Sequence, residues 1–212
     1  MTDPLDELLE ESRQLGYLGP GPTGPHRDHA LAFAEVLPEP PARALDLGAG
    51  GGLPGLVLAA VTWPATTWVF LDAQDRRTAF LEHAVQRLGL ADRVEVRTER
   101  AEVAGRAAGL RASFDLVVAR SFGSPGVTAE CAAPFLRVGG HLVVSEPPGS
   151  EGSRWPIDGL AEVGLADPEV LEVAGAHAEA PTSVRLVRLR QAACCGDRYP
   201  RRTGIPAKRP LF

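Results

Sequence analysis

Short apolar runs and longer amphipathic stretches alternate through most of the chain. The apolar runs predict five buried strands, at residues 44–47, 68–71, 94–97, 114–119 and 141–145. Apolar residues at helical spacing between them predict helices at residues 54–61, 76–88, 102–108 and 127–136. Two later strands are expected at residues 170–173 and 184–189. Strict alternation of strands and helices predicts an α/β fold with a doubly wound, mostly parallel sheet of about seven strands and helices on both faces.

The first 41 residues differ from the rest of the chain. Helices are expected at residues 4–14 and 26–37, and they are separated and followed by segments rich in glycine and proline, at residues 16–25 and 38–41. We therefore expect a short helical N-terminal extension, residues 1–41, followed by one main domain, residues 42–212.

Composition excludes several classes of protein. A chain of 212 residues with 44% hydrophobic and 23% charged residues is typical of one globular domain. No apolar run approaches the roughly 20 residues of a membrane helix, and the acidic N-terminus is unlike a signal peptide. The three cysteines, Cys131, Cys194 and Cys195, lack the spacing of metal ligands. We expect a cytoplasmic protein without disulfides, bound metal or membrane contact, and a monomer by default.

The charge is unevenly distributed around its total of −5. Residues 185–212 carry eight basic side chains and one acidic one, whereas residues 1–184 carry 14 basic and 26 acidic ones. A basic segment on an acidic body suggests an anionic partner that is met at one edge. The alternative is a solvated tail whose arginines pair with the acidic body, and charge alone does not separate the two.

A glycine-rich turn, residues 48–55, follows the first strand. Ligands of doubly wound sheets bind beyond the carboxyl ends of the strands, and glycines let the backbone approach a ligand closely. The spacing from Gly50 to Gly55 also satisfies the dinucleotide fingerprint, so NAD is one reading of the turn. Asp46, two residues before Gly48, would repel a pyrophosphate and attract the ammonium group of S-adenosylmethionine. We therefore favour S-adenosylmethionine over NAD and over a turn without a ligand.

Three further charged residues stand at predicted strand ends. Asp72 lies about 20 residues after the turn, the distance at which a carboxylate takes the ribose hydroxyls of a bound nucleoside. Glu102 is placed to flank an adenine, although taken alone it reads as an acid in the first turn of a helix. Arg120 is placed to meet the cofactor carboxylate or a substrate phosphate, and its alternative is an ion pair.

The sequence offers no acid–base pair for catalysis. The fourth strand ends in Arg120-Ser121-Phe122, without the Asn/Asp-Pro-Pro-aromatic motif of enzymes that methylate exocyclic amines and without the cysteine of those that methylate pyrimidine C5. Glu146-Pro147-Pro148 resembles the former motif but follows the fifth strand, and we read it as a loop. The five histidines form no spaced pair, so a metal site is not expected.

The chain resembles the bacterial 16S rRNA guanine-N7 methyltransferase family (RsmG, formerly GidB). The resemblance rests on Leu45-Asp46-Leu47-Gly48-Ala49-Gly50-Gly51-Gly52-Leu53-Pro54-Gly55, on Phe70-Leu71-Asp72 with Arg76-Arg77 and Phe80-Leu81, on Ala119-Arg120-Ser121-Phe122, and on the ending Arg198-Tyr199-Pro200-Arg201-Arg202-Thr203-Gly204-Ile205-Pro206-Ala207-Lys208-Arg209-Pro210-Leu211. It implies a Rossmann-like class I methyltransferase that binds S-adenosylmethionine and acts on 16S rRNA or the small ribosomal subunit. By the same resemblance, cofactor contacts are expected at Gly48, Leu53, Ala101, Glu102 and Arg120.

The predicted reaction is methyl transfer to N7 of a guanine in 16S rRNA. N7 carries a lone pair and no proton, so alignment alone suffices and no catalytic residue is assigned. We expect Asp46, Gly50 and Asp72 to add to the cofactor site, and Arg198, Arg201, Arg202 and Lys208 to contact phosphates. The family's N-terminal Trp-Asn and Asn-Leu-Thr motifs are missing, and Ser145-Glu146-Pro147 replaces its Lys-Gly. A methyltransferase for a small molecule and a non-catalytic cofactor-binding module therefore remain as alternatives.

Overall fold

A seven-stranded sheet forms the centre of the computed structural model, which describes residues 3–147, 149, 152–174 and 183–212. The strand order is β3-β2-β1-β4-β5-β7-β6. Strands β1 to β5 run parallel, and β7 runs antiparallel to both of its neighbours. The bounds are β1 Arg43–Leu47, β2 Thr67–Asp72, β3 Val94–Thr98, β4 Phe114–Ala119, β5 Leu136–Ser145, β6 Leu165–Ala174 and β7 Ser183–Gln191. The prediction of a mostly parallel sheet of about seven strands is confirmed.

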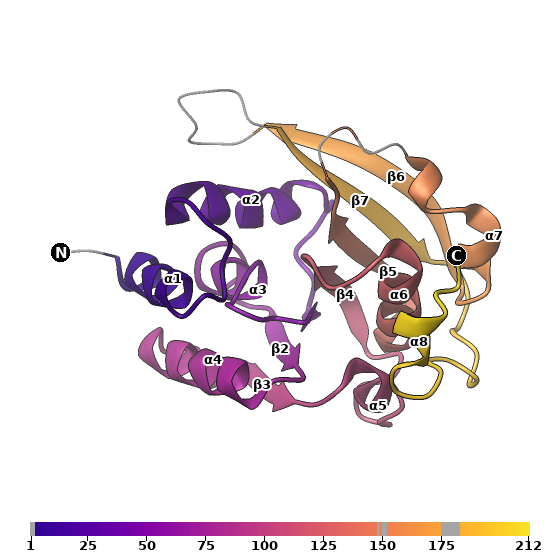
Figure 1. Cartoon of the computed structure of the whole chain (residues 1–212), viewed down its shortest axis with the longest axis horizontal. Coiled ribbons are helices and arrows are strands. Elements are labelled where there is room, and N and C mark those ends of the chain that lie inside the picture. Colours follow the sequence, from indigo (N-terminus) through magenta and orange to yellow (C-terminus); the bar gives the residue numbers. More distant parts are fainter. Residues whose placement is uncertain (1–2, 148, 150–151, 175–182) are drawn as a thin grey trace.

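Helices cover both faces of the sheet (Figure 1). One face carries α1 (Pro4–Gln14), α2 (Thr23–Glu35), α3 (Gly55–Val57), which continues as a π-helical turn over 58–62, and α4 (Asp75–Arg87). The other carries α5 (Ala101–Ala104), α6 (Pro125–Ala132), α7 (Ile157–Ala161) and α8 (Ile205–Lys208), the last packed on α6. The sheet divides the core into two apolar clusters, one on each face.

Successive side chains of a strand belong alternately to these two clusters. Trp68 and Phe70 of β2 belong to the cluster beneath α1 to α4, whereas Val69 and Leu71 belong to the other. Because both faces are covered, the central strands need apolar residues at nearly every position. Asp46 breaks this rule inside β1, where it is 1% exposed. A buried carboxyl group in a central strand directs attention to the loop that follows it.

The N-terminal helices share a core with the main sheet. Leu8, Leu9 and Phe33 are fully buried in the same cluster as residues of α3 and α4. Helix α2 begins at Thr23, three residues earlier than predicted, because Pro25 falls in its first turn, where a helix tolerates proline. The division of the chain at residues 41 and 42 stays a prediction.

Several predicted elements have different bounds in the structure, among them the helix predicted over 102–108, which ends at Ala104. The helix predicted over 127–136 ends at Ala132, and β5 begins at Leu136, because the proline at 134 has no N–H to continue an α-helix. Strand β6 starts five residues before the predicted 170–173 segment. Its pairing with β7 shifts between Ala166 and Glu169, where Asp167 has a φ of 54°.

Membrane-spanning helices and clusters of metal-ligating side chains are considered for the described residues only. Within that part of the chain, no helix is long and apolar enough to cross a membrane. The same residues contain no group of three or more His, Cys, Asp or Glu side chains that could hold a metal ion.

Candidate functional site

Three adjoining cavities line the edge of the sheet where the parallel strands end. The β2–β3 cavity, about 200 Å³, is bordered by the ends of β2 and β3. The glycine-loop cavity, about 270 Å³, is bordered by the turn after β1, and the β4–β5 cavity, about 340 Å³, by the ends of β4 and β5. Gly48 lines the first two cavities, and Arg120 and Ser121 line the last two. The site is therefore a row of adjoining spaces with shared walls, at the edge predicted from the sequence.

The glycine turn lies between Phe122, which follows β4, and Ser12 of helix α1. Gly48 has a φ of 73°, and a Cβ atom built there would lie 2.6 Å from Cδ2 of Phe122. A Cβ atom at Gly51 would lie 2.3 Å from Oγ of Ser12, which donates a hydrogen bond of 2.9 Å to the Gly51 carbonyl oxygen. Glycine at these positions lets Phe122 and the N-terminal helices approach the turn closely. Gly48, Gly50 and Leu53 all line the glycine-loop cavity.

Asp46 lies beneath this turn. Its Oδ2 accepts a hydrogen bond of 2.7 Å from the Gly55 amide, and its buried Oδ1 has no partner among the described residues. Burial raises the pKa of Asp46 from 3.8 to about 7; the Gly55 amide opposes this shift, the negative charge of Asp72 adds to it, and Arg120 opposes it. A buried oxygen without a hydrogen bond costs free energy. Oδ1 of Asp46 is therefore available to accept a hydrogen bond from a donor group of a ligand. The contact with an ammonium group stays a prediction.

Asp72 connects two of the cavities. Its Oδ2 accepts a hydrogen bond of 2.9 Å from the Gly50 amide, its Oδ1 accepts one of 2.9 Å from the Gln74 amide, and the nearest guanidinium nitrogen of Arg77 lies 3.6 Å away. The side chain lines the β2–β3 cavity. Each carboxylate oxygen has two lone pairs, so Asp72 keeps acceptor capacity for ribose hydroxyls after fixing the turn.

The end of β3 supplies Ala101 and Glu102 to the β2–β3 cavity. Oε1 of Glu102 accepts a hydrogen bond of 2.8 Å from the backbone amide of Gly204, which lies 102 residues later in the chain. Pro206 and Ala207 of α8 line the same cavity. The sequence predicts that Glu102 lies beside a ligand, and the structure adds that Glu102 holds the C-terminal segment, residues 196–212, through Gly204.

Arg120 stands between the glycine-loop and β4–β5 cavities. Its Nη2 donates a hydrogen bond of 2.9 Å to Nδ1 of His26, while Nη1 is buried without a partner among the described residues. His29 lines the β4–β5 cavity, and burial, aided by the positive charges of Arg120 and His26, lowers its pKa to about 4. No spaced histidine pair was recognised in the sequence. His26 and His29 are three residues apart in one helix, a spacing that places both on one face and could have signalled the cluster.

The β4–β5 cavity contains a buried acid with two partners. Glu146 is 8% exposed; its Oε2 lies 2.6 Å from Nη1 of Arg154, and its Oε1 accepts a hydrogen bond of 3.0 Å from the Trp155 indole. All three line the cavity together with Phe122. The loop reading of residues 146–147 agrees with the structure, and Pro148 lies outside the described residues. Arg154 and Trp155 were missed because no motif marks them.

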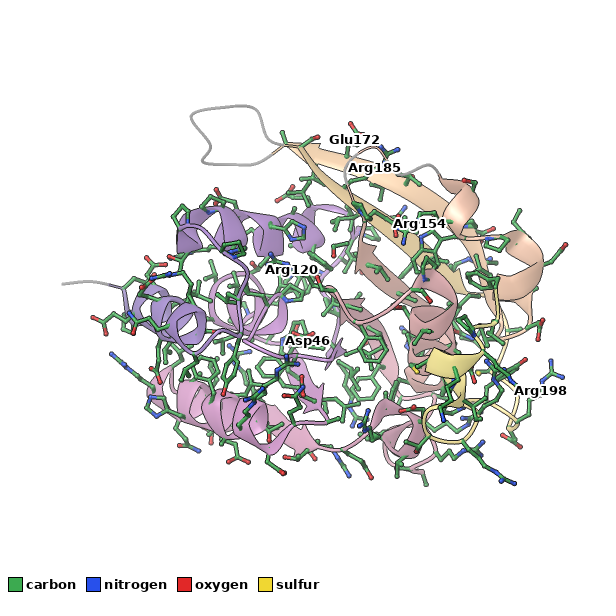
Figure 2. The ribbon with its side chains drawn as sticks, viewed as in Figure 1. Asp46, Arg120, Arg154, Glu172, Arg185 and Arg198 are labelled. Carbon is green, nitrogen blue, oxygen red and sulfur yellow. The ribbon has the colours of Figure 1, made fainter. Side chains whose placement is uncertain are left out.

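The basic segment is largely paired with the acidic body. Ion pairs join Arg185 to Glu172, Arg188 to Glu169, Arg190 to Asp167, Arg198 to Glu162 and Arg201 to Glu130. Figure 2 labels one of these pairs, Arg185 and Glu172, on strands β6 and β7, and shows Arg198 at the lower right, away from that pair. Arg202 and Lys208 are exposed and form no ion pair with any residue that the structure describes. The structure gives Arg201 a protein partner, so a phosphate contact is better sought at Arg202 and Lys208.

Comparisons with known proteins give consistent results. The sequence pattern of the rRNA small subunit methyltransferase G family (GidB) matches residues 26–146. Ribosomal RNA small subunit methyltransferase G of Synechococcus sp. strain CC9902 is 35% identical over 182 residues, which cover 85% of this chain and 74% of the relative. The protein of that name from Moorella thermoacetica is also 35% identical, with coverage of 87% and 75%.

Solved structures show the same architecture. A putative O-methyltransferase from Klebsiella pneumoniae superposes with a TM-score of 0.63 at 16% identity, covering 91% of each chain. An O-methyltransferase from Bacillus cereus in complex with SAH superposes with a TM-score of 0.60 at 17% identity, covering 90% of this chain and 92% of the other. At such identities the likeness concerns the fold, which is that of class I methyltransferases.

Proposed function

The chain belongs to the rRNA small subunit methyltransferase G family, and from this premise we propose that it transfers a methyl group from S-adenosylmethionine to N7 of a guanine in 16S rRNA. The observation that carries the proposal is the row of adjoining cavities, in which Arg120 and Ser121 form a shared boundary between the glycine-loop cavity and the β4–β5 cavity. A transferase needs such adjacency, because donor and acceptor must meet within one site.

The residues of the first two cavities fit S-adenosylmethionine. Asp46 offers an unsatisfied oxygen for the ammonium group, Gly48 and Gly50 allow close approach, and Asp72 offers acceptors for the ribose. When bound, the cofactor supplies a methyl group on a positively charged sulfur. Leu53, Ala101 and Glu102 complete the proposed contacts.

The β4–β5 cavity suits a nucleobase. The half-buried Phe122 brings an aromatic ring to its wall, and aromatic side chains stack on unpaired bases of RNA. No residue is needed as a base, since N7 has no proton to lose. The chain's task is to hold the guanine with N7 toward the glycine-loop cavity and to keep Arg120 in place through His26. Glu146 keeps Arg154 at the rim, where a guanidinium can contact a phosphate or base.

The RNA partner is proposed to meet the exposed cations near these cavities. Arg100 lines the β2–β3 cavity, and Arg202 and Lys208 are exposed on the segment that borders it. Cations in this arrangement position a phosphate backbone without reading its sequence. We place the reaction in the cytoplasm, where small ribosomal subunits are found.

A labelling experiment tests the proposal. The protein is incubated with methyl-labelled S-adenosylmethionine and small ribosomal subunits that lack N7 methylation, and labelled nucleosides are then identified. We expect label in 7-methylguanosine and none with subunits that are already methylated. No label, with cofactor binding still measurable by calorimetry, would overturn the rRNA assignment and favour a small-molecule acceptor or a non-catalytic role.

A further inference from the structure

The C-terminal segment, residues 196–212, is fixed to the body of the protein by its backbone. Arg111 donates hydrogen bonds to the carbonyl oxygens of Gly196, at 3.1 Å, and Tyr199, at 2.9 Å, and Arg106 donates one of 2.5 Å to that of Pro200. The end of the chain lies against α6, since a Cβ atom at Gly126 would be 2.7 Å from the Phe212 carbonyl oxygen. A segment whose carbonyl groups are bonded in this way is part of the folded domain.

The same segment contributes to a wall of the β2–β3 cavity. The Glu102 carboxylate accepts the Gly204 amide and so ties residue 204 to the end of β3. Pro206, which is buried, and Ala207 then line the cavity. Phe122 and Val127 add further apolar surface. The cavity thus joins apolar side chains to the Asp72 carboxylate, a combination that suits a flat purine attached to a ribose.

We propose that residues 204–207 form part of the S-adenosylmethionine site and contact the adenosine half of the cofactor. This inference rests on the S-adenosylmethionine dependence in the proposed function and on no particular methyl acceptor. It gives the C-terminal segment two roles. Pro206 and Ala207 serve the cofactor, whereas the exposed Arg202 and Lys208 remain open to an anionic partner.

Neighbouring substitutions separate these roles. Ala207 is exposed and lines the cavity, and Lys208 is exposed and does not. Replacing Ala207 by tryptophan fills space that the adenosine would occupy, so A207W should weaken binding of S-adenosylhomocysteine by about tenfold or more. K208W is the matched control, and its affinity should stay within about twofold of that of the unmodified protein. Isothermal calorimetry measures both, and circular dichroism checks that both variants fold. Wild-type affinity in a folded A207W would overturn the proposal.

Hydrogen exchange provides a readout that needs no substitution. S-adenosylhomocysteine bound against residues 204–207 should slow exchange of the amides of residues 204, 205 and 207, including the Gly204 N–H held by Glu102. Peptides from β6, at the far edge of the sheet, should exchange at an unchanged rate. Saturating ligand that protects the glycine turn but leaves residues 204–207 unprotected would overturn the proposal. Neither measurement involves RNA, so failure to form 7-methylguanosine would refute the proposed acceptor and leave this inference standing.

Discussion

The carboxylate of Glu130 is fully buried and binds the guanidinium of Arg201 through both of its oxygens. Nε of Arg201 lies 2.9 Å from Oε1, and Nη2 lies 2.6 Å from Oε2. The Arg201 backbone amide donates a further bond of 2.8 Å to Oε1, and Nη2 also reaches the Arg209 carbonyl oxygen. Arg201 was expected to contact RNA phosphates, and it instead anchors the C-terminal segment to helix α6 through Glu130.

Replacing Arg201 by alanine should destabilise the fold strongly. The change leaves the Glu130 carboxylate buried without its cation, which typically costs about 3–5 kcal/mol. The control is R202A, an exposed neighbour whose loss should change the free energy of unfolding by about 0.5 kcal/mol or less. Urea unfolding of the two variants checks this, and equal losses would contradict the anchoring role.

The buried carboxyl group of Asp46 should make stability depend on pH. Its pKa is raised from 3.8 to about 7 in the folded protein, so the folded state holds a proton that the unfolded state releases. The contribution of Asp46 to stability should therefore fall as the pH rises from about 4 to about 7. The variant D46N cannot ionise, and its free energy of unfolding should lack this component when unfolding is measured at pH 5 and pH 8. An identical pH dependence in both proteins would contradict the assignment.

Arg154 should matter for methylation more than for cofactor binding. It lines the β4–β5 cavity and pairs with Glu146, and neither residue lines the glycine-loop cavity or the β2–β3 cavity. We expect R154A to lower kcat/KM with ribosomal subunits by about tenfold or more, because an interaction with a charged group is removed. Calorimetry with S-adenosylhomocysteine should give an unchanged affinity. R190A, in an exposed pair with Asp167, is the control and should leave kcat/KM unchanged.

RNA affinity should depend on salt through the exposed cations. Removing one cation that binds a phosphate lowers the magnitude of the slope of log K against log salt concentration by about 0.7 to 0.9. We therefore expect R202A and K208A each to reduce the slope by about that amount. R185A is the comparison, because Arg185 is engaged with Glu172 on the β6–β7 hairpin and should leave the slope unchanged. Equal slopes for the unmodified protein and all three variants would indicate that these cations do not bind RNA.

The fold and the location of the site followed from local patterns in the sequence. Apolar runs are visible within a few residues, and the glycine turn after β1 indicates the edge at which the cavities lie, because the strand and the turn are adjacent in sequence. The bond from His26 to Arg120 spans 94 residues, and that from Gly204 to Glu102 spans 102. Such contacts depend on how distant elements pack. The sequence therefore indicates Glu102 and Arg201 as site residues but not their partners, Gly204 and Glu130.

The β6 edge of the sheet also limits what the chain can associate with. Strand β6 pairs only with β7 among the described strands, and an unpaired edge ordinarily invites a strand from another molecule. Here Pro168 has no N–H to donate, the pairing register shifts around Asp167, and the exposed side chains of Glu169 and Glu172 place negative charge on the strand. These features discourage edge-to-edge pairing, so copies of the protein at high concentration in a crowded cell should resist β-sheet aggregation through this strand.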